Sequence, residues 1–329
     1  MSTRTIRQPA TRIAVLPLAA IVIAAASVSL AMSFGTVLSA QEPNRIEGIG
    51  PLGPVEKIAG DFQFTEGPAV DDDGTLYFTD IPNERIHRWA QSDGLSTLLE
   101  PSGHANGLLW TAATGLIGCQ MDGRVVAIDV TDGSVKVLAE AFEGVRFNAP
   151  NDLVVDSQGG IYFTDPLYLA PEPLPQGKMS VYYITPAGKV SRVVDSLPAP
   201  NGIVLSPDES VLYVIPSQDP QVRTYEVKSP GVLGEERIHC RLQLPEGVTA
   251  GQGGDGGTVD ESGNLYVTTA LGVQVIAPDG DRLGTIEFPE HPANVTFGGS
   301  DFRTLIVTAR TSVYRVPLQV RGHRYRGAR

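Results

Sequence analysis

Hydrophobic and polar positions follow a repeating pattern along most of this chain. Six times, an oxygen-bearing residue, usually followed by Gly, precedes an apolar stretch and a turn, and a β-rich run begins ten or eleven residues later. The intervals are 40, 45, 50, 54 and 39 residues, and the six leading residues are Glu66, Asn106, Asn151, Asn201, Asp255 and Asn294. A period of this length that consists of strands and turns is typical of a β-propeller with one four-stranded blade per repeat. We therefore predict an all-β, six-bladed β-propeller.

The strand-like runs also predict how the ring closes. Four runs, LYFTD (76–80), IYFTD (161–165), LYVTT (265–269) and LIVTA (305–309), occupy the same phase of the repeat and are good inner-blade strands. The stretch 55–64 has no blade of its own, and we predict that it pairs with the C-terminal strands around 312–317. This pairing removes two exposed sheet edges. In each blade the leading residue is expected at the start of the innermost strand, so that all six face the channel from one end.

The chain divides into four segments. Arg4, Arg7 and Arg12 precede an uncharged, apolar run from Ile13 to Ala40, which is typical of a secretory signal that is cleaved near Ala40. This interpretation predicts an exported protein, periplasmic or secreted, while an uncleaved N-terminal membrane anchor is the alternative because the run is long enough to span a bilayer. We assign residues 1–40 to the signal, 41–54 to a linker, 55–318 to the propeller and 319–329 to a basic tail, expected as a frayed end.

Charge and cysteine content narrow the classes of function. Without residues 1–40 and their three arginines, the net charge changes from −12 to −15. A field of this sign repels nucleic acid and anionic membranes and suits a protein that binds cations. The two cysteines, Cys119 and Cys240, are too few for a disulfide scaffold, and the sequence leaves open whether they pair. Oligomeric state is equally open.

The six leading residues offer a ligand oxygen atoms only. Two are carboxylates and four are amides, with no thiolate or imidazole among them. Such hard ligands suit Ca²⁺, and less strictly Mg²⁺ or Mn²⁺. The alternative is that these residues only start strands, because Asn and Asp before Gly are common in turns. Six in the same phase, including two carboxylates, favour a site.

The repeats resemble those of the gluconolactonase, regucalcin and senescence-marker-protein family. The similar text is FTEGPAVDDDGTLYFTD, APNDLVVDSQGGIYFTDP, APNGIVLSPDESVLYV, GGDGGTVDESGNLYV and FGGSDFRTLIVT, and it extends over roughly residues 55–316. The resemblance implies a six-bladed propeller with a divalent cation at the channel centre, with Ca²⁺ as first choice and Mg²⁺, Mn²⁺ or Zn²⁺ as alternatives. The matching positions imply four ligands: Glu66, Asn151, Asn201 and Asp255.

The same resemblance implies roles for other residues. Asp255 is the catalytic candidate for activating water, and His104 and Asn106 fall where family members contact substrate. Asp152 follows a proposed ligand, which it can orient, and we group it with the substrate-binding residues. One departure from the family is the Gly-rich loop 249–257 (TAGQGGDGG), which puts the family's substrate preferences in doubt.

The function implied is a divalent-metal-dependent hydrolase of a sugar lactone or related ester, in which the metal polarises the carbonyl for attack by water. Two alternatives stay open. One is a metal-stabilised propeller that binds a ligand without turnover, and the other is a phosphotriesterase-like hydrolase.

Overall fold

The computed structural model describes residues 45–249 and 251–327, and the segment expected to be a signal, residues 1–40, lies outside them. Within the described residues, no helix has the length and apolar character that crossing a membrane requires. The one helical element there is a short 3₁₀ turn, η1 (Ile81–Asn83). Everything else is strand, turn or loop, so the all-β prediction is confirmed.

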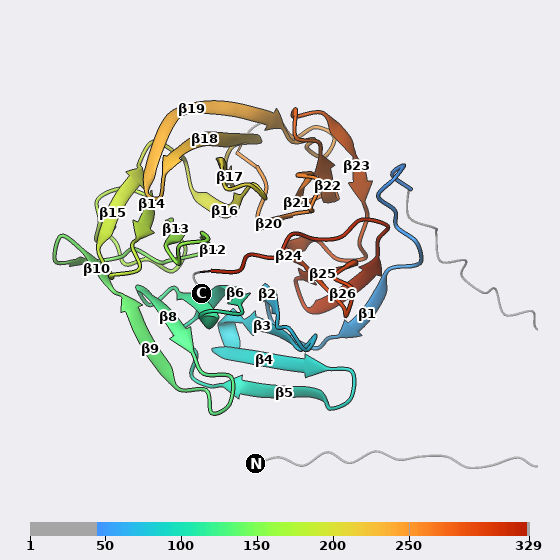
Figure 1. Cartoon of the computed structure of the whole chain (residues 1–329), viewed down its shortest axis with the longest axis horizontal. Coiled ribbons are helices and arrows are strands. Elements are labelled where there is room, and N and C mark those ends of the chain that lie inside the picture. The colour runs from blue at the N-terminus through green and yellow to red at the C-terminus, as the bar shows by residue number, and fades with distance from the viewer. Residues whose placement is uncertain (1–44, 250, 328–329) are drawn as a thin grey trace, which may run out of the picture. The chain divides into compact units, whose positions relative to one another are not determined.

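Six four-stranded antiparallel sheets form a ring around a central channel (Figure 1). The first blade consists of β2 (Thr65–Val70), β3 (Leu76–Asp80), β4 (Arg85–Ala90) and β5 (Gly94–Leu99). The second consists of β6 (Ala105–Thr111), β7 (Gly115–Gln120), β8 (Arg124–Ile128) and β9 (Val135–Ala139). The third consists of β12 (Leu153–Val155), β13 (Ile161–Asp165), β14 (Ser180–Ile184) and β15 (Val190–Val194). A small hairpin, β10 (Ala141–Phe142) and β11 (Val145–Arg146), precedes the third blade.

The second half of the ring repeats this arrangement. The fourth blade consists of β16 (Pro200–Leu205), β17 (Val211–Pro216), β18 (Gln221–Ser229) and β19 (Val232–Arg241). The fifth consists of β20 (Gly257–Val259), β21 (Leu265–Thr269), β22 (Gly272–Ile276) and β23 (Arg282–Ile286). The sixth consists of β24 (Pro292–Gly298), β25 (Thr304–Ala309), β26 (Ser312–Pro317) and, from the N-terminal side, β1 (Glu56–Ala59).

The ring closes as the sequence predicts. Strand β1 pairs antiparallel with β26, with Glu56 opposite Arg315, and becomes the outer strand of the last blade. Residues 45–54, the described part of the predicted linker, are not loose, because Ile46 and Ile49 are buried in the core shared by the fifth and sixth blades. The closure therefore joins the two ends of the chain in one sheet and in one core.

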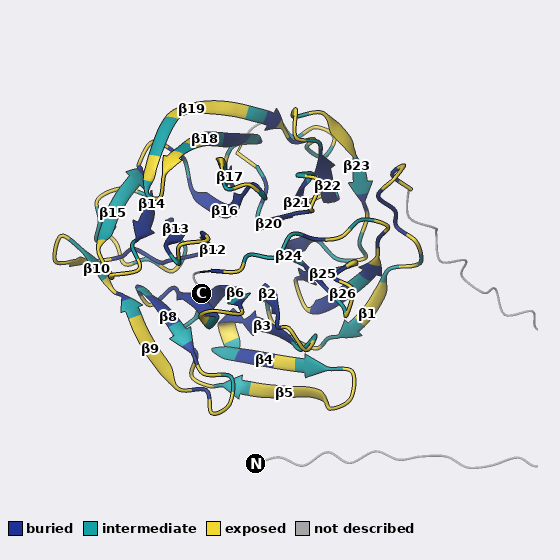
Figure 2. Ribbon diagram, in the orientation of Figure 1, coloured by how far each residue is buried: buried dark blue, intermediate teal, exposed yellow. Residues whose placement is uncertain are grey.

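The core lies between blades. The inner and second strands are buried almost throughout, while the outermost strands β5, β9 and β19 are largely exposed (Figure 2). Cys119 and Cys240 are buried free thiols in two different core clusters, so no bridge joins them. Because adjacent blades pack through apolar side chains, the polar residues of the inner strands are left to face the channel.

The basic tail differs from the frayed end that the sequence predicts. It runs across the ring at the end where the inner strands finish (Figure 1). The backbone N–H of His323 donates to the carbonyl of Val259 at 2.9 Å, and the hydroxyl of Tyr325 donates to the carbonyl of Leu205 at 2.6 Å. The ring of Tyr325 also packs against the core clusters of the third, fourth and fifth blades. Residues 321–327 therefore cover the channel at the end opposite the leading residues.

Candidate active site

The six leading residues of the repeat lie at one end of the inner strands. Each stands within the first three residues of its inner strand or two residues before it. Five of them are buried, with relative exposures between 4% and 6%, and Asp255 is half-buried. The structure thus brings these residues to the same rim of the channel, where the phase of the repeat predicts them.

A side-chain contact across the channel shows that the opposite blades meet there. Asp152, at the start of the third blade, receives a hydrogen bond of 3.5 Å to its Oδ2 from Nδ2 of Asn294, on the inner strand of the sixth blade. Each side chain is also fixed by its own backbone: Asp152 Oδ1 accepts from Leu153 N at 2.9 Å, and Asn294 Oδ1 accepts from Val295 N at 2.7 Å. The channel at this level is therefore filled by polar side chains.

Three carboxyl groups share this small volume. Burial raises the pKa of Glu66 well above its usual value, and the nearby charges of Asp255 and Asp152 raise it further. Burial also raises the pKa of Asp152 to about 7 and that of Asp255 to about 7. The Arg310 guanidinium and a hydrogen bond from Asn201 limit the rise at Asp255. Three buried carboxyl groups that repel one another form a site that a cation stabilises.

The amides around the carboxyl groups also indicate a cation site. Asn106 is buried, its Nδ2 donates to the sulfur of Met121 at 3.7 Å, and its Oδ1 has no hydrogen-bond partner. A buried carbonyl oxygen without a donor is costly unless a ligand completes it. Asn151 is also buried, and its backbone is held by a 2.9 Å bond to Thr164 O. The donors present are carboxylate and amide oxygens, the set that Ca²⁺ and similar hard cations prefer.

Close contact between neighbouring inner strands explains the glycines that follow several leaders. The N–H of Gly107 donates to Asn151 O at 2.8 Å, and the N–H of Gly202 donates to Asp255 O at 2.9 Å. A Cβ atom at Gly202 would lie 2.4 Å from that same oxygen. Only glycine permits this approach, so the residue after the leader sets the spacing between two neighbouring ligand candidates.

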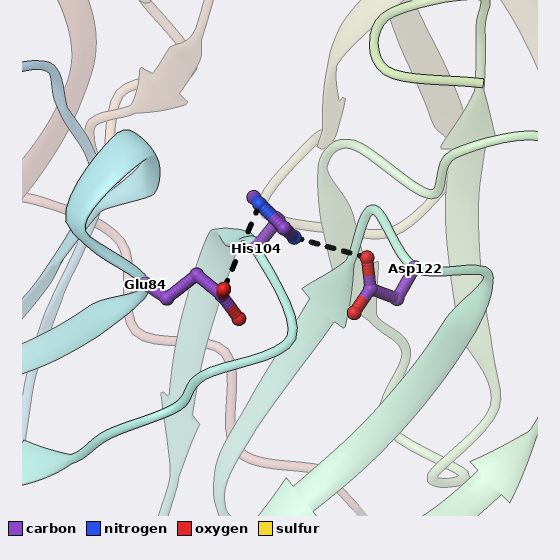
Figure 3. Close-up of side chains that lie close together, drawn as sticks. All are labelled: Glu84, His104 and Asp122. Atoms are coloured by element: carbon purple, nitrogen blue, oxygen red, sulfur yellow. Dashed lines mark hydrogen bonds and ion pairs between the residues drawn. The ribbon is translucent and has the colours of Figure 1, made fainter.

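His104 lies apart from this group, at the outer rim between the first and second blades. Its Nδ1 is 3.0 Å from Asp122 Oδ1, and its Nε2 is 3.9 Å from Glu84 Oε1 (Figure 3). The side chains of these three residues retain exposures between 35% and 51%. One imidazole and two carboxylates are a second donor set for a cation, but they are partly exposed, and the imidazole is already hydrogen-bonded to Asp122. A substrate contact for His104 stays a prediction.

The structure adds neighbours of the site that the repeat does not mark. The hydroxyl of Tyr168, in the loop after β13, is hydrogen-bonded to Ser217 Oγ. Burial raises the pKa of Tyr168, and the charge of Asp255 raises it further. The guanidinium of Arg310 lies over the ring of Phe64, with 5.1 Å between the carbon and the ring centroid. These residues lie in loops that differ from blade to blade, so no repeat could reveal them.

The family profile described as SMP-30/Gluconolactonase/LRE-like region matches residues 64–311. The gluconolactonase of Zymomonas mobilis subsp. mobilis is 32% identical over 294 residues, which cover 80% of this chain and 81% of that protein. The regucalcin of Xenopus laevis is 26% identical over 260 residues, which cover 77% of this chain and 85% of that protein.

A solved structure agrees with these matches. A gluconolactonase of Xanthomonas campestris superposes with a TM-score of 0.72 at 29% identity, over 80% of this chain and 89% of that one. The calcium-binding protein regucalcin of Agrobacterium tumefaciens superposes with a TM-score of 0.70 at 20% identity, which speaks for the fold alone. Sequence and structure therefore point to one family.

Proposed function

Because this chain belongs to the SMP-30/gluconolactonase/LRE-like family, a family of lactone hydrolases, we propose that it hydrolyses a lactone or related ester with a divalent cation bound at the channel rim. The observation that carries the proposal is the meeting of Glu66, Asp152 and Asp255 at one end of the channel. Burial raises the pKa values of all three, and the charge of Asp255 raises those of Glu66 and Asp152 further. Relatives named gluconolactonase and regucalcin support both halves of it.

Four residues would hold the cation: Glu66, Asn151, Asn201 and Asp255. Two carboxylates balance the charge of a divalent ion, and the two amide oxygens add ligands without adding charge. When bound, the cation would polarise the carbonyl of the substrate and stabilise the negative charge that develops on its oxygen. Asn294 and Asp152 would hold the ligand-bearing strands in place through their contact across the channel.

Asp255 is the residue that fits the role of general base. Burial raises its pKa to about 7 in the cation-free protein, and a bound cation would lower the pKa again. The role therefore rests on its two oxygens, since one can bind the cation while the other accepts a proton. Asp152 has a similar pKa, but it is buried and its oxygens already accept from Leu153 N and Asn294 Nδ2. Asp255 is less buried than Glu66 and Asp152. We therefore assign the base to Asp255.

The reaction requires two proton transfers. Asp255 accepts a proton from the attacking water as the water oxygen bonds to the lactone carbonyl carbon. The bond between that carbon and the ring oxygen then breaks, and the same proton is returned to the departing oxygen. The product is an open hydroxy acid, so each turnover releases acid that a pH indicator detects.

Metal dependence is tested by removal and restoration. The protein is treated with a chelator, dialysed, and assayed on D-glucono-δ-lactone and simpler lactones by acid release, before and after addition of Ca²⁺, Mg²⁺, Mn²⁺ or Zn²⁺. We expect loss of turnover on chelation and recovery with at least one ion. If chelation melts the protein and no lactone is turned over by the metal-loaded form, the chain is a metal-stabilised binding propeller instead.

The role of Asp255 is tested by Asp255→Asn. Because the amide keeps an oxygen ligand but cannot accept the proton, turnover should fall by about two to four orders of magnitude, while the affinity for the cation falls less. Calorimetric titration of the metal and kcat separate the two effects. The exposed Asp132→Asn on the turn between β8 and β9 is the matched control. Near-normal turnover of Asp255→Asn would exclude it as the base.

A further inference from the structure

One side of the channel mouth is apolar. Six side chains form a contact cluster there that belongs to no blade-to-blade core: Ile81, Met121 and Ala149 are buried, and Phe64, Tyr168 and Ala170 are partly buried. They come from loops at the leader end of the first three blades, directly before β2 or after β3, β7, β11 and β13. We call this cluster the apolar wall.

The apolar wall is continuous with the proposed reaction centre. Met121 accepts a hydrogen bond through its sulfur from Asn106, one of the six leading residues, at 3.7 Å. Tyr168 is hydrogen-bonded to Ser217, which directly follows β17, the second strand of the fourth blade. A molecule bound at the leading residues therefore has the wall beside it.

The loop after β13 continues the apolar surface outward. Residues 166–175 read PLYLAPEPLP, with four prolines that limit the freedom of the backbone. On either side of Tyr168, Leu167 is 39% exposed and Leu169 is 63% exposed. Leu169 is held at φ +56°, a conformation that costs a non-glycine residue free energy. A run of apolar side chains presented this way beside a polar channel is typical of a ligand-binding surface.

The chemistry of the wall selects against hydroxyl groups. The partly buried side chains of Phe64 and Ala170 have no hydrogen-bonding atom. The buried members of the wall add only the thioether of Met121, a weak acceptor already in contact with Asn106. A hydroxyl that leaves water to face such a surface loses its hydrogen bonds without replacement. An alkyl or aryl group there is favoured, because it removes apolar area from water on both sides.

Resting on the proposed function, we infer that the substrate carries an apolar substituent: the site takes lactones with an alkyl or aryl group on the ring in preference to polyhydroxylated sugar lactones. The polar end of the molecule lies at the three carboxyl groups, and the substituent lies along the partly buried Tyr168, Phe64 and Ala170. The reaction is still the hydrolysis of a lactone, as in the family. The substrate, however, is an apolar lactone and not the sugar lactone that the sequence implies.

The inference is tested first on the unaltered, metal-loaded protein. The substrates are an unsubstituted δ-lactone, the same ring bearing a methyl, propyl or pentyl group, and D-glucono-δ-lactone. We expect kcat/KM to rise by about two- to fourfold for each added methylene, since burial of one methylene gives this factor. Most of the rise should come from a lower KM, and the pentyl lactone should exceed D-glucono-δ-lactone.

Two variants of Tyr168 assign the preference to the wall. Tyr168→Phe keeps the ring and removes only the hydroxyl, so the dependence on chain length should persist. Tyr168→Ser removes the ring, so the pentyl lactone should lose about tenfold or more of its advantage over the unsubstituted ring. Leu95→Ser on the outer strand β5, where Leu95 is 45% exposed, is the control that should behave as the unaltered protein.

Failure of the inference and failure of the proposed function give different results. If D-glucono-δ-lactone is preferred, or if kcat/KM does not depend on chain length, the apolar preference is wrong and the lactonase proposal stands. If chain-length dependence survives in Tyr168→Ser as strongly as in Tyr168→Phe, the wall does not cause it. If no lactone is hydrolysed with any metal, the proposed function itself falls, and the inference with it.

Discussion

At the scale of single residues, the spacing of the candidate ligands depends on glycines that carry no chemistry. Gly202 follows Asn201 and touches the backbone of Asp255 in the next blade, through an N–H···O bond of 2.9 Å. Gly256, which follows Asp255, makes the same kind of close contact with the sixth blade. A Cβ added to Gly256 would lie 2.1 Å from Asn294 Oδ1. The Gly that follows a leader is therefore a packing requirement of the ring.

Gly202→Ala should consequently disturb stability and cation affinity together. The new methyl would lie 2.4 Å from Asp255 O and 3.0 Å from the Cδ1 of Ile215, so the fourth and fifth blades must separate at the site. We expect a loss of about 1–3 kcal/mol in the free energy of unfolding, as for other overpacked positions. The added stability that Ca²⁺ confers should also shrink, as measured by thermal unfolding with and without the ion.

The matched control is Gly53→Ala. Its Cβ would meet Pro317 Cγ at 3.4 Å, an ordinary contact far from the leading residues. If Gly202→Ala unfolds at the same temperature as Gly53→Ala and gains as much from Ca²⁺, close approach at Gly202 does not control the site.

The sequence predicts part of this site and misses the rest for a physical reason. The leaders recur in phase because each starts an inner strand, so their common position can be read from the repeat. The contact of Asn294 with Asp152 across the channel joins residues 142 positions apart on opposite blades, and no spacing encodes it. Arg310 lies in a loop that does not repeat, so its place beside the leaders depends on the closed ring.

At the scale of elements, the turns between the first two strands of the first, third and fifth blades share one set of hydrogen bonds, each centred on an aspartate. In the third blade, Asp156 Oδ1 accepts from Gln158 N at 2.9 Å and Gly160 N at 2.8 Å, while Oδ2 accepts from the hydroxyl of Tyr183 at 2.8 Å. Asp71 and Asp260 do the same in the first and fifth blades. The pairs Asp–Gly, Gly–Gly and Ser–Gly at these turns are typical of hairpins, but they do not predict the tyrosine on the second or third strand that completes each turn.

The closing blade has a further tie, through Glu290. Its carboxylate accepts from Thr311 N at 2.9 Å, from Tyr314 OH at 2.8 Å and from Ser312 Oγ. Burial alone would raise the pKa of Glu290, but these hydrogen bonds outweigh it and lower the pKa to about 2, from an ordinary value of 4.5. The loop before β24 is thereby fastened to the turn and strand at the start of β26.

Glu290→Gln should therefore reduce stability in a pH-dependent way. A carboxyl group whose pKa is lower in the folded protein stabilises it above pH 4.5, and this stabilisation disappears as the pH falls through 2. Near neutral pH we expect a loss of about 1 kcal/mol, because the group is partly exposed and water screens its contribution. The gap in melting temperature between the two proteins should close between pH 4.5 and pH 2.

Glu287→Gln in the same loop provides the comparison, since Glu287 is exposed. Melting curves by circular dichroism across this pH range distinguish the two variants. A gap that stays constant down to the lowest pH would show that the charge of Glu290 does not contribute.

At the scale of the whole molecule, the C-terminal tail covers one end of the channel. Besides the bonds of His323 and Tyr325, Arg324 forms an ion pair of 3.0 Å with Asp72, and Arg321 forms one of 3.4 Å with Glu261. The sequence predicts a frayed end because the tail is short and basic. That prediction fails because an acidic propeller attracts the arginines and because Tyr325 supplies the apolar ring that packs.

A cavity of about 610 Å³ remains beneath the tail, lined by Trp110, Thr258, Tyr325 and their neighbours. It lies at the finishing end of the inner strands, away from the leading residues, and the tail lines one side of it. For the proposed reaction, we expect substrate to enter from the leader end, past the apolar wall, and the tail to act on stability and not on turnover.

Removal of residues 321–329 tests this division of roles. The truncation exposes the carbonyl of Leu205 and the core surfaces that Tyr325 covers, a loss of about 2–3 kcal/mol from one aromatic side chain. For a domain of this size the melting temperature should fall by roughly 4–10 °C, while kcat on a lactone measured well below that temperature stays close to that of the full chain. Tyr325→Phe, which lacks only the bond to Leu205, should show a smaller fall. If the truncated protein melts like the full chain, the tail does not stabilise the ring. If the truncated protein is stable but its kcat is altered, the tail end of the channel also contributes to the reaction.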